Sequence, residues 1–169
     1  MNIEKLKFYP VKTVEKLASF HLRLFIDRVF FKGKDKDNNS FGGYKSEQYV
    51  DMKSRGFVKK RGRGRYKGYV EQPIESTQTG KVDLKATGKL WKATHAYDED
   101  TNSYRIGWDE NRDKKFKTEN VQIVQGQKKQ GRDILGVPDS EMEKVVNQLG
   151  NFTEKLINKI VKNVNIRVG

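Results

Sequence analysis

Two helical patterns near the ends of the chain constrain its fold more than any other feature. In residues 11–32, apolar side chains recur every three or four positions, which is the spacing of one face of an amphipathic helix. Gly33 and the polar run 34–40 predict where this helix ends. The apolar positions of this first helix are Val11, Val14, Leu17, Leu24, Phe25 and Val29.

A second amphipathic helix is predicted over residues 140–164. Ser140 and Glu143 have the spacing of a capping box, in which two side chains satisfy unpaired backbone donors at a helix start. Gly150 and a second possible cap at 151–154 leave open whether this is one kinked helix or two collinear ones. The tail 165–169 is separate, and the alternation in "VNIRV" is compatible with a strand. The predicted apolar face comprises Met142, Val145, Val146, Leu149, Phe152, Leu156, Ile157, Ile160 and Val164.

The segments between the two long helices predict a sheet region over residues 82–136. Residues 93–97 and 104–108 read as strands of an antiparallel hairpin, joined by the polar turn "DEDTNS". Residues 112–125 fit a helix and a strand equally well. Before this region, Ser46 is expected to cap a short helix that runs to Ser54.

Composition indicates one soluble domain, residues 1–169. Hydrophobic and charged residues each make up 34% of the chain, so the core must be small and most elements one-sided. The absence of cysteine excludes disulfides, thiolate metal sites and cysteine nucleophiles. No apolar run approaches the length of a membrane span, and the charged N-terminus lacks the apolar run of a signal peptide. We therefore expect a cytosolic protein without membrane contact.

The net charge of +13 is concentrated in one stretch. Eight basic residues and no acid lie between Lys53 and Lys67, which leaves +5 for the rest of the chain. Because residues 53–81 show no apolar period, we expect a long basic loop or a floppy β-excursion, which we place at 57–80. Basic residues interleaved with glycine and tyrosine are typical of a nucleic-acid-binding arm. The candidate contact residues are Lys59, Lys60, Arg61, Arg63, Arg65 and Lys67.

A search for chemical motifs predicts no enzyme, no cofactor and no metal site. Asp35, Asp37 and Asn39 match the first ligand positions of a calcium-binding EF-hand loop, but serines occupy its glycine and glutamate positions, so a polar turn is expected. The glycines of the basic stretch do not have the spacing of a phosphate-binding loop. His21 and His95 are expected to be structural, and the two tryptophans to be core or interface anchors.

Three fragments, in order, resemble the bacteriophage virion morphogenesis proteins. "KGKDKDNNSFGGYKSEQYVDMK" (32–53) is similar to that family's turn followed by aromatic, Tyr-Ser, Tyr and Lys positions, although the family commonly has glycine at Asn38 or Asn39. "VDLKATGKLWKA" (82–93) resembles its Leu-x-x-Thr-Gly signature, and "GRDILGVPDSEMEKV" (131–145) its Arg-x-hydrophobic-hydrophobic-Gly ending. The family-motif residues are Leu84, Thr87, Gly88, Arg132, Leu135 and Gly136.

The resemblance implies an α+β fold, in which long N-terminal and C-terminal helices flank an antiparallel sheet. It also implies a non-enzymatic structural protein that forms a homo-oligomeric ring in the neck, the head–tail connector or the tail-completion region of a tailed phage. Its partners would be portal, adaptor or tail proteins, and it would be assembled into the virion in the bacterial cytoplasm. The basic stretch would then contact a neighbouring acidic ring, packaged DNA or solvent. The alternative is a small basic nucleic-acid-binding protein that uses residues 53–67.

Overall fold

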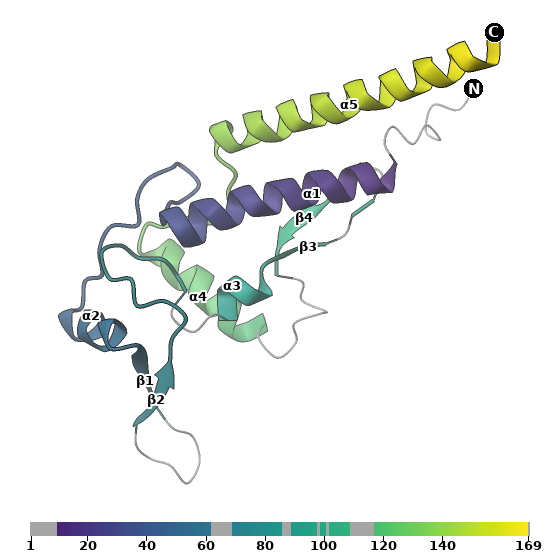
Figure 1. Cartoon of the computed structure of the whole chain (residues 1–169). Helices are drawn as coiled ribbons and strands as arrows, with labels where there is room; N and C mark the ends of the chain where they lie inside the picture. The colour runs from purple at the N-terminus through teal and green to yellow at the C-terminus, as the bar shows by residue number, and fades with distance from the viewer. Residues whose placement is uncertain are drawn as a thin grey trace. The chain divides into compact units, whose positions relative to one another are not determined.

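The computed structural model describes residues 10–61, 69–85, 89–97, 99–100, 102–108 and 117–168 (Figure 1). The chain divides into two compact units, one made of Met1–Leu24, Ala96–Ile106 and Val137–Gly169, and the other of Phe25–His95 and Gly107–Gly136. The fold is α+β, with long helices near both ends and antiparallel strand pairing, as the sequence predicts.

The first helix follows the predicted pattern. It comprises α1 (Val11–Ile26) and continues without a break as a π-helix, η2 (Asp27–Lys32). Val14, Leu17 and Ala18 are buried, because the three- and four-residue spacing places them on one face. Gly33 then ends the helix in the left-handed conformation, with φ of 63°.

The C-terminal helix α5 (Asp139–Val168) is a single element of 30 residues (Figure 1). It passes through Gly150 without interruption, which decides between the one-helix and two-helix interpretations. The expected strand-like tail is wrong, because the helix continues to Val168; a local alternation does not outweigh the helix that precedes it. The helix also begins at Asp139, so Ser140 lies inside its first turn and not at the N-cap.

The predicted apolar face of α5 is only partly covered. Val145 is buried, whereas Met142, Val146 and Ile157 are 46%, 57% and 54% exposed. These three side chains recur every four or eleven residues and therefore lie along one side of the helix. We call them the α5 apolar row.

The strands 93–97 and 104–108 are confirmed in shorter form. β3 (His95–Tyr97) pairs with β4 (Arg105–Gly107). In the turn between them, an Asp100 carboxylate oxygen accepts hydrogen bonds from the backbone N–H groups of Asn102 and Ser103, at 2.6 and 2.7 Å. A carboxylate that replaces missing backbone partners is the usual reason for aspartate in a tight turn.

Two short strands within residues 57–80 pair as a hairpin. β1 (Phe57–Arg61) pairs antiparallel with β2 (Tyr69–Pro73), in a register that sets Lys59 opposite Glu71 and Arg61 opposite Tyr69. The long-loop prediction is therefore wrong for these ten residues, and the β-excursion is the correct alternative. The two strands lie within the stretch and pair with each other, and strand pairing is a contact between segments that no apolar period along the chain reveals.

Helices occupy much of the predicted sheet region. α3 (Lys89–Ala93) and α4 (Lys117–Lys129) both lie within residues 82–136, so the helical interpretation of 112–125 is correct for its described part. The short helix α2 (Glu47–Ser54) is also confirmed, and the Ser46 hydroxyl accepts the Tyr49 N–H at its start.

Candidate functional site

A fully buried ion pair lies in the second unit. Lys53, the last-turn lysine of α2, has no exposed surface, and its Nζ lies 2.8 Å from Oδ1 of Asp83, which is 4% exposed. A buried charge without a partner is very costly, so each of these residues requires the other. Lys53 is one of the eight basic residues between 53 and 67, and its burial removes it from those that a nucleic acid could reach.

Every proton on the Lys53 ammonium is used inside the protein. It donates to the Tyr44 hydroxyl at 2.7 Å, to the Gln78 carbonyl at 2.6 Å and to Asp83 at 2.8 Å. A lysine ammonium has three donors, so none is left for a ligand. Lys53 is therefore a brace between α2 and the 76–83 segment, and it is neither a nucleophile nor a binding group.

Asp83 is held as a carboxylate. It accepts hydrogen bonds from the Ser76 hydroxyl and from the backbone N–H of Lys85, in addition to Lys53. Burial by itself would raise the pKa of Asp83, but these donors outweigh burial and lower the pKa below its usual value. Burial also raises the pKa of Tyr44, whose hydroxyl donates to Asp83. Near neutral pH, Asp83 is therefore ionised and the Tyr44 hydroxyl keeps its proton.

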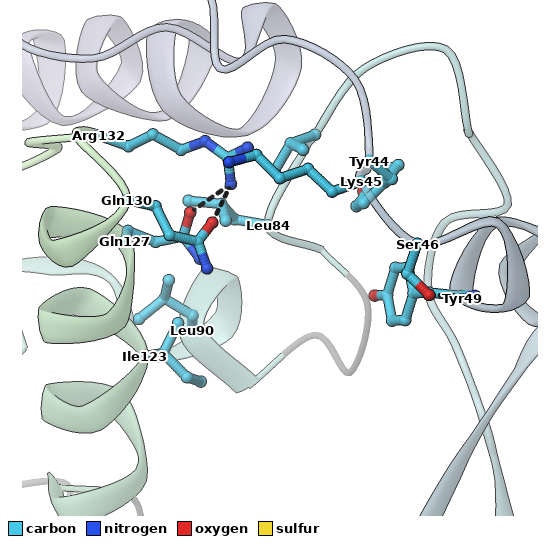
Figure 2. Close-up of a pocket in the computed structure, with 11 residues that line it drawn as sticks. Tyr44, Lys45, Ser46, Tyr49, Leu84, Leu90, Ile123, Gln127, Gln130 and Arg132 are labelled. Atoms are coloured by element: carbon cyan, nitrogen blue, oxygen red, sulfur yellow. Dashed lines mark hydrogen bonds between the residues drawn. The ribbon is translucent and has the colours of Figure 1, made fainter.

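A guanidinium is fixed at the end of α4 by a glycine-dependent turn. Gly131 adopts a φ of 77°, its N–H bonds the Lys128 carbonyl, and the Arg132 N–H bonds the Gln127 carbonyl. These two bonds define a Schellman motif, which reverses the chain after a helix. Arg132 can then donate through Nη1 to the side-chain oxygens of Gln127 at 3.0 Å and Gln130 at 2.8 Å (Figure 2).

Arg132 lies over a pocket of about 400 Å³ in the second unit (Figure 2). The most deeply buried lining side chains are Val82 and Leu90, and exposed residues such as Lys45 and Ser46 form the rim. The described lining includes two cations and no carboxylate. We call this the Arg132 pocket; its lining is Tyr44, Lys45, Ser46, Tyr49, Val82, Leu84, Leu90, Ile123, Gln127, Gln130 and Arg132.

The family-motif residues have different environments. Leu84 and Arg132 both line the Arg132 pocket, whereas Leu135 is exposed and the Gly136 carbonyl accepts a bond from Arg28 at 2.9 Å. Thr87 and Gly88 lie outside the described residues. Residues 82–85 form no strand, and Leu84 lies in a turn with φ of 53°.

The candidate basic contact residues are only partly described. Lys59, Lys60 and Arg61 belong to β1, and Arg63, Arg65 and Lys67 lie outside the described residues. Of the two other cations in the stretch, Lys53 is buried and Arg55 pairs with Asp51 at 2.9 Å. The stretch therefore offers fewer than eight cations to a partner.

The polar turn at 35–39 is a turn in the structure. Asp35 is buried, and its Oδ1 accepts the backbone N–H groups of Asp37 and Asn39 at 2.9 and 2.8 Å. Asn38 has a φ of 62°, the conformation that glycine adopts most easily and asparagine tolerates best among the other residues. This explains how Asn38 can occupy a position at which the family that the chain resembles commonly has glycine.

Both histidines and both tryptophans have structural contacts. His21 Nδ1 lies 3.0 Å from the Tyr104 hydroxyl, and His95 Nδ1 lies 2.7 Å from the Ala93 carbonyl. The Trp91 ring packs edge-on against Phe30, and Trp108 donates to the Leu90 carbonyl at 3.1 Å. Among the described residues, no three potential metal ligands gather in one place. Within the same residues, every helix is too short or too polar to span a membrane.

Comparisons with protein-family models, with curated proteins and with solved structures find no match for this chain. Sequence reasoning missed the Lys53–Asp83 pair and the Arg132 pocket. The one available signal was Asp83 itself, a carboxylate between the apolar residues Val82 and Leu84 that would need a cationic partner if it were buried.

Proposed function

We propose that this chain is a structural virion protein of a tailed bacteriophage, and that it forms a closed ring in the neck, the head–tail connector or the tail-completion region. Its role is mechanical and not enzymatic. Its partners are identical copies of itself and the portal, adaptor or tail proteins on either side, and packaged DNA passes through the ring.

The supporting observation is that the first resembling fragment bonds to each of the other two, and that the second and third line one pocket. Lys53 of the first fragment pairs with Asp83 of the second, and the Lys36 N–H of the first donates to the Asp133 carbonyl of the third at 2.7 Å. Leu84 and Arg132, from the second and third, line one pocket. Fragments that resemble the family by chance would not be expected to lie next to one another in the fold. Their meeting supports a likeness of fold.

The chemistry of the buried cluster supports a role without catalysis. The Lys53 donors are all used, and Asp83 is stabilised in one ionisation state. A general base or nucleophile needs an available lone pair and access to a substrate. A saturated buried pair instead stiffens the link between two segments, which suits a part that must keep its shape under load.

The α5 apolar row supplies a surface for contacts between copies. Met142, Val146 and Ile157 are exposed on one side of a 30-residue helix. Apolar side chains in a row favour burial against another protein. A ring needs two different surfaces on each copy, and the row is proposed as one of them.

A stop codon in the gene, introduced into the phage that encodes it, tests this function. We expect DNA-filled heads and separate tails in electron micrographs, and wild-type protein supplied in trans should restore joined particles. A variant with Met142, Val146 and Ile157 changed to serine should fail to restore joining. The matched control changes Lys144, Asn147 and Lys155 on the same helix, which are also exposed, and should restore it. Normal tailed particles from the stop-codon phage would contradict the proposal.

The β1–β2 hairpin favours a second candidate, nucleic-acid binding. A two-stranded ribbon fits the major groove of DNA, and this one holds the sequence Lys59-Lys60-Arg61 in its first strand. This function predicts binding of the purified protein to duplex DNA without any other phage component. Absence of binding at low salt would exclude it.

A further inference from the structure

Within the described part of the chain, no carboxylate lines the Arg132 pocket to neutralise its charge. Among the described residues, Arg132 bonds only neutral groups, the side-chain oxygens of Gln127 and Gln130, and Lys45 stands at the rim. The nearest acidic residue along the chain, Asp133, faces Lys128 at 4.0 Å. Asp83, beside the lining residue Val82, is neutralised by Lys53. The pocket therefore has a surplus of positive charge.

The guanidinium is also held in place before any ligand arrives. Two glutamine contacts on Nη1 restrict the rotamers of Arg132, and the Schellman turn at Gly131 fixes its backbone. The Nε and Nη2 donors take no part in the bonds to Gln127 and Gln130. A carboxylate can accept two parallel hydrogen bonds from a guanidinium edge. Side-chain entropy that is already lost does not oppose binding.

The rest of the pocket suits an apolar group. Val82, Leu84, Leu90 and Ile123 supply aliphatic surface, and Tyr49 lies across from them (Figure 2). The volume of about 400 Å³ is at the small end of the range for ligand sites. Its rim is exposed at Lys45, Ser46 and Gln130. An open rim fits a side chain that enters from a partner's surface better than a metabolite, which is usually almost enclosed.

We propose that the Arg132 pocket is a docking site for a peptide segment of a partner protein in which an acidic residue neighbours a large apolar one. The acidic side chain pairs with Arg132, and the apolar side chain packs against Leu90 and Ile123. This proposal goes beyond the ring function and does not depend on it, because it rests on the pocket alone.

Two blocked dipeptides test the charge requirement on the wild-type protein. N-acetyl-glutamyl-phenylalanine amide has the proposed chemistry, and its glutaminyl analogue has the same shape without the charge. In a ¹H–¹⁵N NMR titration, the acidic peptide should shift the amide signals of Leu90, Ile123 and Gln127. It should bind about tenfold more tightly than the neutral peptide, as expected for one charged hydrogen-bonded contact. Equal affinities, or shifts confined to other residues, would overturn the proposal.

The Arg132→Gln variant tests whether Arg132 is the group that binds the carboxylate of the acidic peptide. The variant should lose about tenfold in affinity for the acidic peptide and leave the neutral one unchanged. Lys129→Gln is the matched control, because it removes one positive charge from the same helix end at an exposed position outside the pocket. It should leave both affinities unchanged. An equal loss in both variants would show long-range attraction in place of docking at Arg132.

A third ligand separates the two possible sources of the carboxylate. 3-Phenylpropanoate has the ring and the charge but no peptide backbone. We expect it to bind at least tenfold more weakly than the acidic peptide. Binding of equal strength at the same residues would assign the pocket to small carboxylates and overturn the peptide assignment.

Discussion

Lys53 and Asp83 form an ion pair that is buried completely, with Nζ and Oδ1 2.8 Å apart. They lie 30 positions apart in the chain and join α2 to the segment that precedes α3. The pair therefore links the first and second resembling fragments, and it provides the sharpest test of how this unit is held together.

Lys53→Met should destabilise the protein by about 3–5 kcal/mol, because it leaves the Asp83 carboxylate buried without its counter-charge. The measurement is urea unfolding followed by circular dichroism at neutral pH. Lys92→Met is the matched control, since Lys92 pairs with Glu75 in solvent and should cost less than about 1 kcal/mol. Similar losses of stability in the two variants would show that the buried pair stabilises the protein no more than an exposed pair does.

Acid should weaken the fold through Asp83. Its pKa is lower in the folded protein than in the unfolded chain, so the stabilisation is complete above the ordinary carboxyl pKa of about 4. It is lost as the pH falls through the folded value. Urea unfolding between about pH 6 and pH 2 should show this decline.

The Asp83→Asn variant isolates this contribution. Its free energy of unfolding should start lower and change less over the same acid range. Some slope should remain, because backbone hydrogen bonds from Asn102 and Ser103 lower the pKa of Asp100 as well. An unchanged slope in the variant would mean that Asp83 does not titrate with unfolding.

Gly33 should not tolerate a side chain. At its φ of 63° a Cβ is strained, and that atom would lie 2.5 Å from the Val82 carbonyl oxygen, which is fixed backbone. Gly42 has a similar φ of 70° but open space around it. Gly42→Ala should cost about 1–2 kcal/mol from strain alone, and Gly33→Ala about 1–3 kcal/mol more. Thermal and urea unfolding of the two variants should separate the cost of backbone strain from the cost of the steric clash. Equal losses of stability in the two variants would show that the clash at Gly33 costs nothing.

Any duplex DNA binding should be salt-dependent, with fewer than eight phosphate contacts from the basic stretch because Lys53 is buried. With seven contacts, the logarithm of the binding constant falls with the logarithm of salt concentration at a slope of about −6. Replacing Lys59, Lys60 and Arg61 with glutamine should reduce the slope by up to about 3. The control replaces Lys144, Lys155 and Lys159 of α5 and should leave it nearly unchanged. Fluorescence anisotropy at several salt concentrations measures the slope for each variant. Equal changes of slope in the two variants would show that binding depends on total charge and not on the β1 strand.

The sequence by itself determined the elements that depend on near neighbours. The three- and four-residue spacing of 11–32, the left-handed glycine at position 33 and the Ser46 cap each act within one or two turns. Such signals are complete in the local sequence, because helix hydrogen bonds join residues only four or five apart. The polar turns around Asp35 and Asp100 were readable for the same reason.

Tertiary structure decided everything that depends on residues distant in the chain. Lys53 looks like the surface lysines beside it, and only the approach of Asp83 makes it a buried brace. No apolar period predicts the β1–β2 pairing. Arg132 lines the same pocket as Leu84 and Leu90, and it does so after Gly131 reverses the chain. Burial and strand pairing are free energies of contact between segments. A linear pattern indicates which side chains need a partner, but the folded chain decides which partner each one finds.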